Sequence, residues 1–325
     1  MSTHTPNLWV ILSQTSHVIR AHTLHFLALS ALFIFPISIW SIIYPFLLQP
    51  NSVNSDYDRY LFIFTADPQT YPAGKSQLLF SILNALLLLI FSFCATTSIT
   101  FTTFQVFHGR PVSFISSLKS ILVSFFPLLA TRLLIQIILG LVIFAFVILM
   151  LLSYNALVLL GFVVDYDSEY LLVFVILLSA LLLVPLVYLQ VEWCLSTAVV
   201  VVESEWGLVP LKRSSYLVKG LRRIALSLMI FVGTLVGLSW FWYSNLLDGI
   251  RRGQISWWFF LLQMAVYAGF LTILSLYSFV ANTILFVYCK DFHGELAFEV
   301  DEKLGLEYVR LPSDDGVDSS VVNIV

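Results

Sequence analysis

Six long apolar stretches, separated by polar segments, divide the amino-acid sequence. A helix that crosses the hydrocarbon layer of a membrane needs about 20 largely apolar residues, and each stretch reaches that length. The fold class predicted is all-α, a polytopic integral membrane protein. The six spans are expected at about residues 24–48, 77–107, 122–152, 170–201, 221–247 and 256–289. Several exceed the minimum, so we expect tilt, extension beyond the membrane, or kinks at prolines such as Pro127 and Pro185.

Short segments of amphipathic character precede the first, third and fifth predicted spans. Their sequences are LWVILSQTSHVIR, PVSFISSLKSIL and GLVPLKRSSYLVK. Helices of this kind lie in the plane of the membrane interface, with basic residues towards anionic headgroups. We therefore predict three transmembrane hairpins, each preceded by a cytosolic interfacial helix. The domains are then residues 1–23 (N-terminal interfacial helix), 24–289 (six-helix domain) and 290–325 (polar cytosolic tail, disordered from about residue 312).

Basic residues are distributed unequally between the two sides of the predicted helices. The segments after spans one, three and five hold four of them, namely Arg59, Lys75, Arg251 and Arg252. The opposite side holds eleven, namely Arg20, Arg110, Lys119, Lys212, Arg213, Lys219, Arg222, Arg223, Lys290, Lys303 and Arg310. Because cytosolic segments carry the excess of Lys and Arg, both termini are predicted to lie in the cytosol.

The composition agrees with a lipid environment. Hydrophobic residues make up 59% of the chain and charged residues 11%, whereas soluble domains average about 25% charged residues. The net charge of −3 gives no indication of a nucleic-acid partner. His17, His22 and His25 recur near the N-terminus, but no Cys or carboxylate stands at ligand spacing. Solvated or headgroup-facing histidines are therefore favoured over a metal site, and no cofactor is expected.

Two charged residues stand out because they lie deep inside predicted spans, where charge is costly and indicates a functional site by default. Arg132 lies about eleven residues into the third span from the cytosolic side, and Glu192 about nine residues from the cytosolic end of the fourth. With a rise of ~1.5 Å per residue, both lie ~14 to 17 Å below the boundary. A structural ion pair between them is favoured, and a polar translocation path, unrelated partners or snorkelling are the alternatives. Gln136 and Gln190 would continue this polar seam.

Hydroxyl-bearing residues are dense in the second predicted span. The run FSFCATTSITFTTFQ contains Thr96, Thr97 and Thr100, which are further candidates for the polar seam. Two interpretations are open. The hydroxyls line a hydrated groove or bind a polar headgroup, or they mark close helix packing and are bonded to the carbonyl four residues earlier. Packing is favoured.

A cluster of basic residues follows the fourth predicted span and reaches the start of the fifth, beside an apolar stripe. Its members are Lys212, Arg213, Lys219, Arg222 and Arg223. Anionic lipid attracts each basic residue near a membrane surface by about 1 kcal/mol, so the cluster is a candidate lipid-facing site. Alternatively, these charges only fix the orientation of the helices in the membrane, and no particular lipid is recognised.

Three segments carry a resemblance to known sequences. The runs AVVVVESEWGLVPLKRSSYLVKG, FQVFHGRPVSFISSLKSI and YCKDFHGE resemble a family of uncharacterised plant multispan membrane proteins. That family is in turn distantly similar to bacterial six-helix membrane-domain families, including the membrane portion of some glycerophosphodiester phosphodiesterases. The resemblance covers about residues 7–295 and implies a six-helix membrane fold without an assigned chemistry. No soluble phosphodiesterase barrel is expected, because no part of the chain has the required length or βα alternation.

Catalytic motifs are not found in the sequence, which contains no nucleophile elbow, paired-carboxylate site or metal-binding helix motif. We therefore expect a non-enzymatic scaffold or accessory protein that organises lipids or partner proteins. Its partners would be the lipid bilayer, anionic headgroups and other membrane proteins, in the endoplasmic reticulum, the secretory pathway or the plasma membrane. A transporter or channel for a small polar or amphiphilic solute is the first alternative, and an intramembrane lipid-modifying enzyme is the second.

Overall fold

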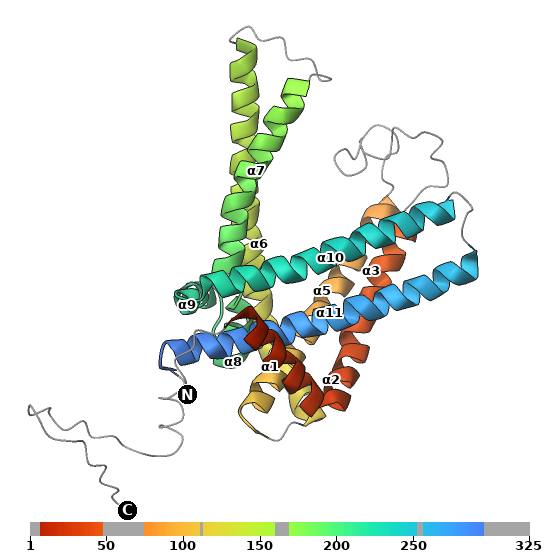
Figure 1. Ribbon diagram of the computed structural model, residues 1–325. Helices are drawn as coiled ribbons and strands as arrows, with labels where there is room; N and C mark the ends of the chain where they lie inside the picture. Colours follow the sequence, from red (N-terminus) through yellow and green to blue (C-terminus); the bar gives the residue numbers. More distant parts are fainter. Residues whose placement is uncertain (1–6, 48–74, 111–112, 160–168, 252–255, 296–325) are drawn as a thin grey trace, which may run out of the picture.

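The computed structural model describes residues 7–47, 75–110, 113–159, 169–251 and 256–295, and the regular structure in these ranges is helical (Figure 1). The elements are α1 (Leu8–Ala21), α2 (Thr23–Leu29), the π-helical segment η1 (Ser30–Ile34), α3 (Phe35–Leu47), α5 (Lys75–Phe107), α6 (Phe114–Leu159), α7 (Glu169–Glu192), α8 (Ser196–Glu203), α9 (Val209–Val218), α10 (Arg222–Arg251) and α11 (Trp257–Phe292). The predicted tail beyond residue 295 lies outside the described residues.

Within the part of the chain that the structure describes, six helical segments are long and apolar enough to cross a membrane. They are Thr23–Tyr44, Leu79–Phe107, Phe114–Ala156, Val173–Glu203, Arg222–Leu246 and Trp258–Phe292. The prediction of an all-α chain with six candidate spans is therefore confirmed, and the helices are compatible with an integral multi-pass membrane protein.

The last helix, α11, lies at the centre of the molecule and contacts α1, η1, α3, α5 and α10. In the 18-residue apolar stretch of its candidate span, 56% of the residues are buried, whereas in the equivalent stretch of the fourth span 0% are buried. The main core forms around the C-terminal half of α11, where Ile284 and Leu285 belong to the same buried cluster as Phe26 of α2 and Leu217 of α9. This core holds the ends of α8 and α9 against α11.

The C-terminal half of α6 and the N-terminal half of α7 extend away from the other helices, whereas the opposite halves pack against α5, α8, α9 and α10 (Figure 1). Apolar side chains along both helices are exposed, among them Leu141, Leu152 and Leu177. Exposing so much apolar surface to water is energetically unfavourable, so these helices are suited to contact with lipid.

The three expected interfacial segments do not form three separate helices. Residues of the first and third segments form the short helices α1 and α9, whereas the second is the beginning of α6, which continues without a break from Phe114 to Leu159. Because no Gly or Pro separates Phe114 from the span, the helical hydrogen bonds simply continue. Pro127 also lies inside this helix, and the hydroxyl of Thr131 donates to the Pro127 carbonyl at 2.9 Å.

Two of the predicted spans are irregular. The first contains η1, which ends two residues before Pro36, and this proline has no N–H to give to the carbonyl four residues earlier. The fourth, expected as one helix over about 170–201, is two helices, because α7 ends at Glu192 and α8 begins at Ser196.

Candidate functional site

The break between α7 and α8 is closed by a side chain from α9. The Ser214 hydroxyl donates to the Glu192 carbonyl at 2.7 Å and accepts from the Leu195 N–H at 3.2 Å. Ser214 is fully buried. One hydroxyl therefore satisfies both a carbonyl and an N–H that the interrupted helix leaves free, which a membrane protein must do internally.

The carboxylate of Glu192 lies at this break and is buried. Arg222, the first residue of α10, places Nη2 2.6 Å from Glu192 Oε1, and the Ser215 hydroxyl donates to Oε2. The Arg222 guanidinium also lies over the Tyr188 ring, 5.8 Å from its centroid. Burial of a carboxylate requires such compensation, so Arg222 neutralises Glu192.

The sequence predicted a different partner for Glu192. Arg132 of α6 is exposed, and it forms no ion pair with any residue that the structure describes. The prediction assumed a continuous fourth span in which both charges lie at equal depth. The break ends α7 at Glu192 and brings this residue to the start of α10, where Arg222 is the nearer cation.

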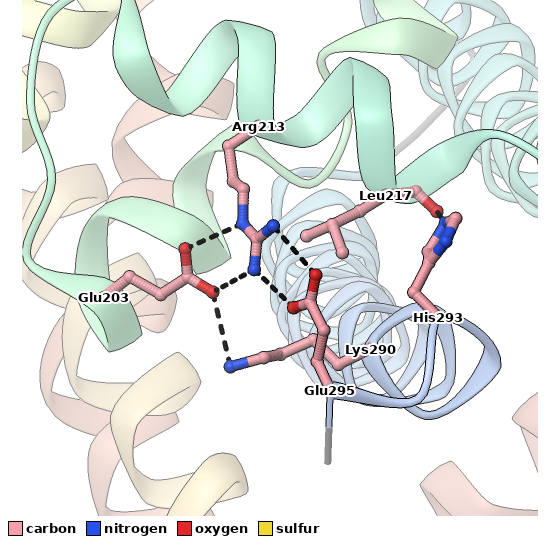
Figure 2. A network of polar contacts seen from close by, with 6 residues as sticks. All are labelled: Glu203, Arg213, Leu217, Lys290, His293 and Glu295. Atoms are coloured by element: carbon pink, nitrogen blue, oxygen red, sulfur yellow. Dashed lines mark hydrogen bonds and ion pairs between the residues drawn. The ribbon is translucent and has the colours of Figure 1, made fainter. Parts of the chain in front are cut away.

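A second group of charges, shown in Figure 2, joins α8, α9 and the end of α11. Arg213 of α9 donates from Nε to Glu203 Oε2 at 3.2 Å and from Nη1 to Glu295 Oε1 at 2.9 Å. Lys290 of α11, which is 3% exposed, places Nζ 3.3 Å from Glu203 Oε1. We call these four residues the clasp. Two carboxylates and two cations make it neutral, so its charges compensate one another.

The electrostatics of Arg213 follow from these contacts. Burial lowers the pKa of Arg213, but the hydrogen bonds to Glu295 and Glu203 outweigh burial and raise the pKa above its ordinary value. Arg213 is therefore a fixed cation that ties α9 to both neighbours.

Further contacts hold the same ends together. The His293 ring stacks on Tyr216 with centroids 4.8 Å apart, and its Nε2 lies 3.2 Å from the Leu217 carbonyl oxygen. Gly220, in the turn after α9, has φ +96°, and a Cβ atom there would lie 2.7 Å from Cε1 of Phe292. The turn therefore favours glycine both for its backbone conformation and for the approach of Phe292.

The predicted basic cluster is divided by these contacts. Arg213 and Arg222 are paired with carboxylates, whereas Lys212, Lys219 and Arg223 are exposed and form no ion pair with another described residue. Two hollows adjoin these three cations. One, of about 370 Å³, includes both lysines in its lining, and the other, of about 420 Å³, lies between α7 and α10 beside Arg223.

The residues of the predicted polar seam lie in two different environments. Thr96, Thr97 and Thr100 of α5 are buried, whereas Gln136 of α6 and Gln190 of α7 are exposed. The Thr96 hydroxyl donates to the Ser92 carbonyl four residues earlier at 2.8 Å, and Thr97 Oγ1 is buried without a hydrogen-bond partner. This pattern favours packing over a hydrated groove for the threonines.

Sequence reasoning missed a polar contact among α2, α5 and α6. Nε2 of His25 lies 3.4 Å from Ser117 Oγ and 3.5 Å from Thr102 Oγ1, and the two hydroxyls are 2.9 Å apart. These residues are far apart in the sequence, so no local pattern could have grouped them. Both hydroxyls are fully buried, so the contact connects helices and does not present a nucleophile.

Comparison with protein families identifies one match. A family model described as a domain of unknown function, DUF8558, matches residues 8–308. The chain belongs to this family. A search of curated proteins and a search of solved structures each found no match.

The DUF8558 match begins at the first residue of α1 and extends past α11, so it contains the α7–α8 break, the clasp and the three exposed cations. Within the described part of this DUF8558 chain, no group of three His, Cys, Asp or Glu residues is arranged to hold a metal ion. The arrangement offers a fixed, internally neutralised frame and, beside it, cations free to attract anions.

Proposed function

We propose that this DUF8558 protein is a non-enzymatic membrane scaffold that gathers anionic lipids at its charged end. The proposal includes a location in the plasma membrane or the secretory pathway with both termini in the cytosol, and kinship with plant multispan proteins and bacterial six-helix membrane domains. The observation that carries it is the division of the basic cluster into paired and unpaired cations.

The unpaired cations are suited to a lipid surface. Lys212 and Lys219 are seven residues apart, which places them on one face of the short α9 segment and its end. Arg223 follows at the start of α10. Each basic residue near an anionic surface contributes about 1 kcal/mol, so the three together contribute about 3 kcal/mol, or about two orders of magnitude in affinity.

The alternatives have less support. A transporter requires a continuous polar path, whereas the buried threonines of α5 and the exposed glutamines of α6 and α7 lie in separate environments. An intramembrane enzyme requires an accessible reactive group, whereas the hydroxyls of Thr102 and Ser117 beside His25 have no exposed surface. A scaffold needs neither feature.

The experiment compares lipid preference in two charge-matched variants of the full-length protein reconstituted in phosphatidylcholine bilayers. Spin-labelled phosphatidylserine and spin-labelled phosphatidylcholine report the selectivity of the lipid shell. The site variant carries Lys212→Gln, Lys219→Gln and Arg223→Gln. The control removes three other exposed cations, through Arg20→Gln, Arg110→Gln and Lys119→Gln.

We expect the wild type and the control to select phosphatidylserine, and the site variant to lose that selectivity. Equal losses in both variants would reduce the effect to unspecific surface charge and contradict the proposal. No selectivity in the wild type, or flux of a polar solute through the same bilayers, would also contradict it.

A further inference from the structure

We propose that the crevice between α7 and α10 binds one acyl chain of an anionic phospholipid, whose phosphate lies at Arg223. This inference rests on the proposed function and names the ligand of one part of that site. The crevice measures about 420 Å³, within the range of about 300 to 1,000 Å³ of small-molecule sites.

The crevice has the polarity of an amphiphile. Its α7 wall consists of apolar side chains such as Leu183, Val187 and Val191, and Leu226 of α10 lies opposite. From residue 183 to residue 192 this wall is ~13 Å long, since a helix rises ~1.5 Å per residue. The charged residues of the lining, Glu192, Arg222 and Arg223, come at the C-terminal end of α7 and the N-terminal end of α10. The crevice is therefore apolar along its length and cationic at one end.

The charges at that end select an anion. Arg222 is occupied by Glu192, with Nη2 2.6 Å from Oε1, so these two residues cancel. Arg223 is exposed and has no described acidic partner, which leaves a net charge of +1. A phosphate complements this charge, and Arg is well suited to phosphate because its guanidinium donates two parallel hydrogen bonds.

The apolar wall identifies the source of the phosphate as a lipid. Leu183 and Val184 line the crevice and are 60% and 68% exposed, so the crevice opens onto the outward surface of α7. An acyl chain can enter from the surrounding bilayer by this route. A soluble phosphate would leave the apolar wall uncovered, whereas a phospholipid covers the wall and meets Arg223 together.

The first test maps the bound lipid on the full-length protein in nanodiscs. Phosphatidylserine that carries a diazirine in its acyl chain is photoactivated, and the modified peptides are identified by mass spectrometry. We expect adducts concentrated on residues 183–191 and on the start of α10, and competition by unlabelled phosphatidylserine. Adducts spread evenly over all spans, or equal competition by phosphatidylcholine or by soluble glycerol 3-phosphate, would overturn the inference.

The second test fills the crevice. Val187→Trp places a large ring in it, whereas Leu181→Trp adds the same ring to an exposed α7 position outside the lining. We expect Val187→Trp to reduce the mapped adducts at least about tenfold, and Leu181→Trp to change them less than about twofold, tenfold being about 1.4 kcal/mol.

Substitutions of Arg223 test the phosphate end of the crevice. Arg223→Gln should reduce the adducts about fivefold and Arg223→Lys less, because one basic residue contributes about 1 kcal/mol. Size-exclusion chromatography shows whether each variant is folded. If Val187→Trp is misfolded, the adduct map of the wild-type protein in the first test decides whether the crevice binds lipid.

These outcomes separate the inference from the proposed function. If the wild type selects phosphatidylserine but Val187→Trp leaves the adducts unchanged, the crevice assignment fails and the scaffold proposal stands. If the wild type selects no anionic lipid, both fail.

Discussion

Glu192 at the end of α7 and Arg222 at the start of α10 form an asymmetric ion pair. The carboxylate side chain is 5% exposed and the guanidinium side chain 43% exposed, with Nη2 2.6 Å from Oε1. The buried Glu192 carboxylate therefore relies on Arg222 to compensate its charge, whereas the guanidinium of Arg222 is also partly exposed. Alone in the protein interior, the carboxylate would carry a desolvation penalty that only its neutralisation or protonation relieves.

The first prediction concerns this dependence. Arg222→Gln should lower the free energy of unfolding, measured by titration with sodium dodecyl sulfate in mixed micelles, by about 2 kcal/mol. That is below the 3 to 5 kcal/mol of a fully buried pair, because Arg222 is partly exposed. The double variant Glu192→Gln with Arg222→Gln should recover part of the loss, because it leaves no unpaired carboxylate.

The control is Arg132→Gln, since Arg132 is exposed and has no ion-pair partner among the described residues. We expect a change within about 0.5 kcal/mol for this variant. A double-mutant cycle that coupled Glu192 to Arg132 and not to Arg222 would disprove the pairing seen here.

The pair also shows what sequence reasoning can and cannot reach. Hydropathy predicted all six candidate spans, because lipid demands long apolar helices whatever their neighbours. It could not predict the partner of Glu192. The residues Trp193, Cys194 and Leu195 at the α7–α8 break include no Gly or Pro, so no local signal predicts the interruption. Ser214, which satisfies the broken backbone, lies 19 residues after Leu195.

The second prediction tests that serine. Ser214→Ala should lower the free energy of unfolding by about 1 to 3 kcal/mol, because the Glu192 carbonyl and the Leu195 N–H would be left buried without a partner. Hydrogen exchange of the Leu195 amide should accelerate. Ser227→Ala is the matched control, since the Ser227 hydroxyl donates to the Ile224 carbonyl of its own helix and bonds to no other helix among the described residues. Equal effects of the two substitutions would mean that Ser214 does not stabilise the break.

The third prediction concerns the clasp. Arg213→Lys keeps the charge but loses the fork of donors that reaches both Glu203 and Glu295. We expect a loss of about 1 kcal/mol, because these side chains are partly exposed, and faster hydrogen exchange over residues 290–294. Lys212→Gln, one residue earlier and outside the clasp, should leave that exchange unchanged. An unchanged exchange rate in Arg213→Lys would show that the clasp does not hold α11.

The pH dependence of the clasp follows from the raised pKa of Arg213. A group whose folded pKa exceeds its unfolded pKa stabilises the protein fully below the unfolded value, and the stabilisation is lost as pH rises through the folded value. That window lies above the ordinary pKa of arginine. Arg213 therefore stays charged from pH 7 to pH 9. We expect the difference in the free energy of unfolding between the wild type and Arg213→Gln to stay constant over this range. A decline centred in this range would contradict the assignment of Arg213 as a fixed cation.

The last prediction separates backbone strain from steric contact at two glycines. Gly207 and Gly220 both have positive φ, of +75° and +96°, so alanine at either position costs about 1 to 2 kcal/mol of strain. Only at Gly220 would the new Cβ meet another atom, Cε1 of Phe292 at 2.7 Å. The Phe292 ring is 54% exposed and can move aside, so we expect an additional loss of about 1 kcal/mol rather than failure to fold. Gly220→Ala should therefore destabilise the protein more than Gly207→Ala, and adding Phe292→Ala should remove the difference between them. Equal destabilisation by the two glycine substitutions would show that the α9–α10 turn does not pack against the end of α11.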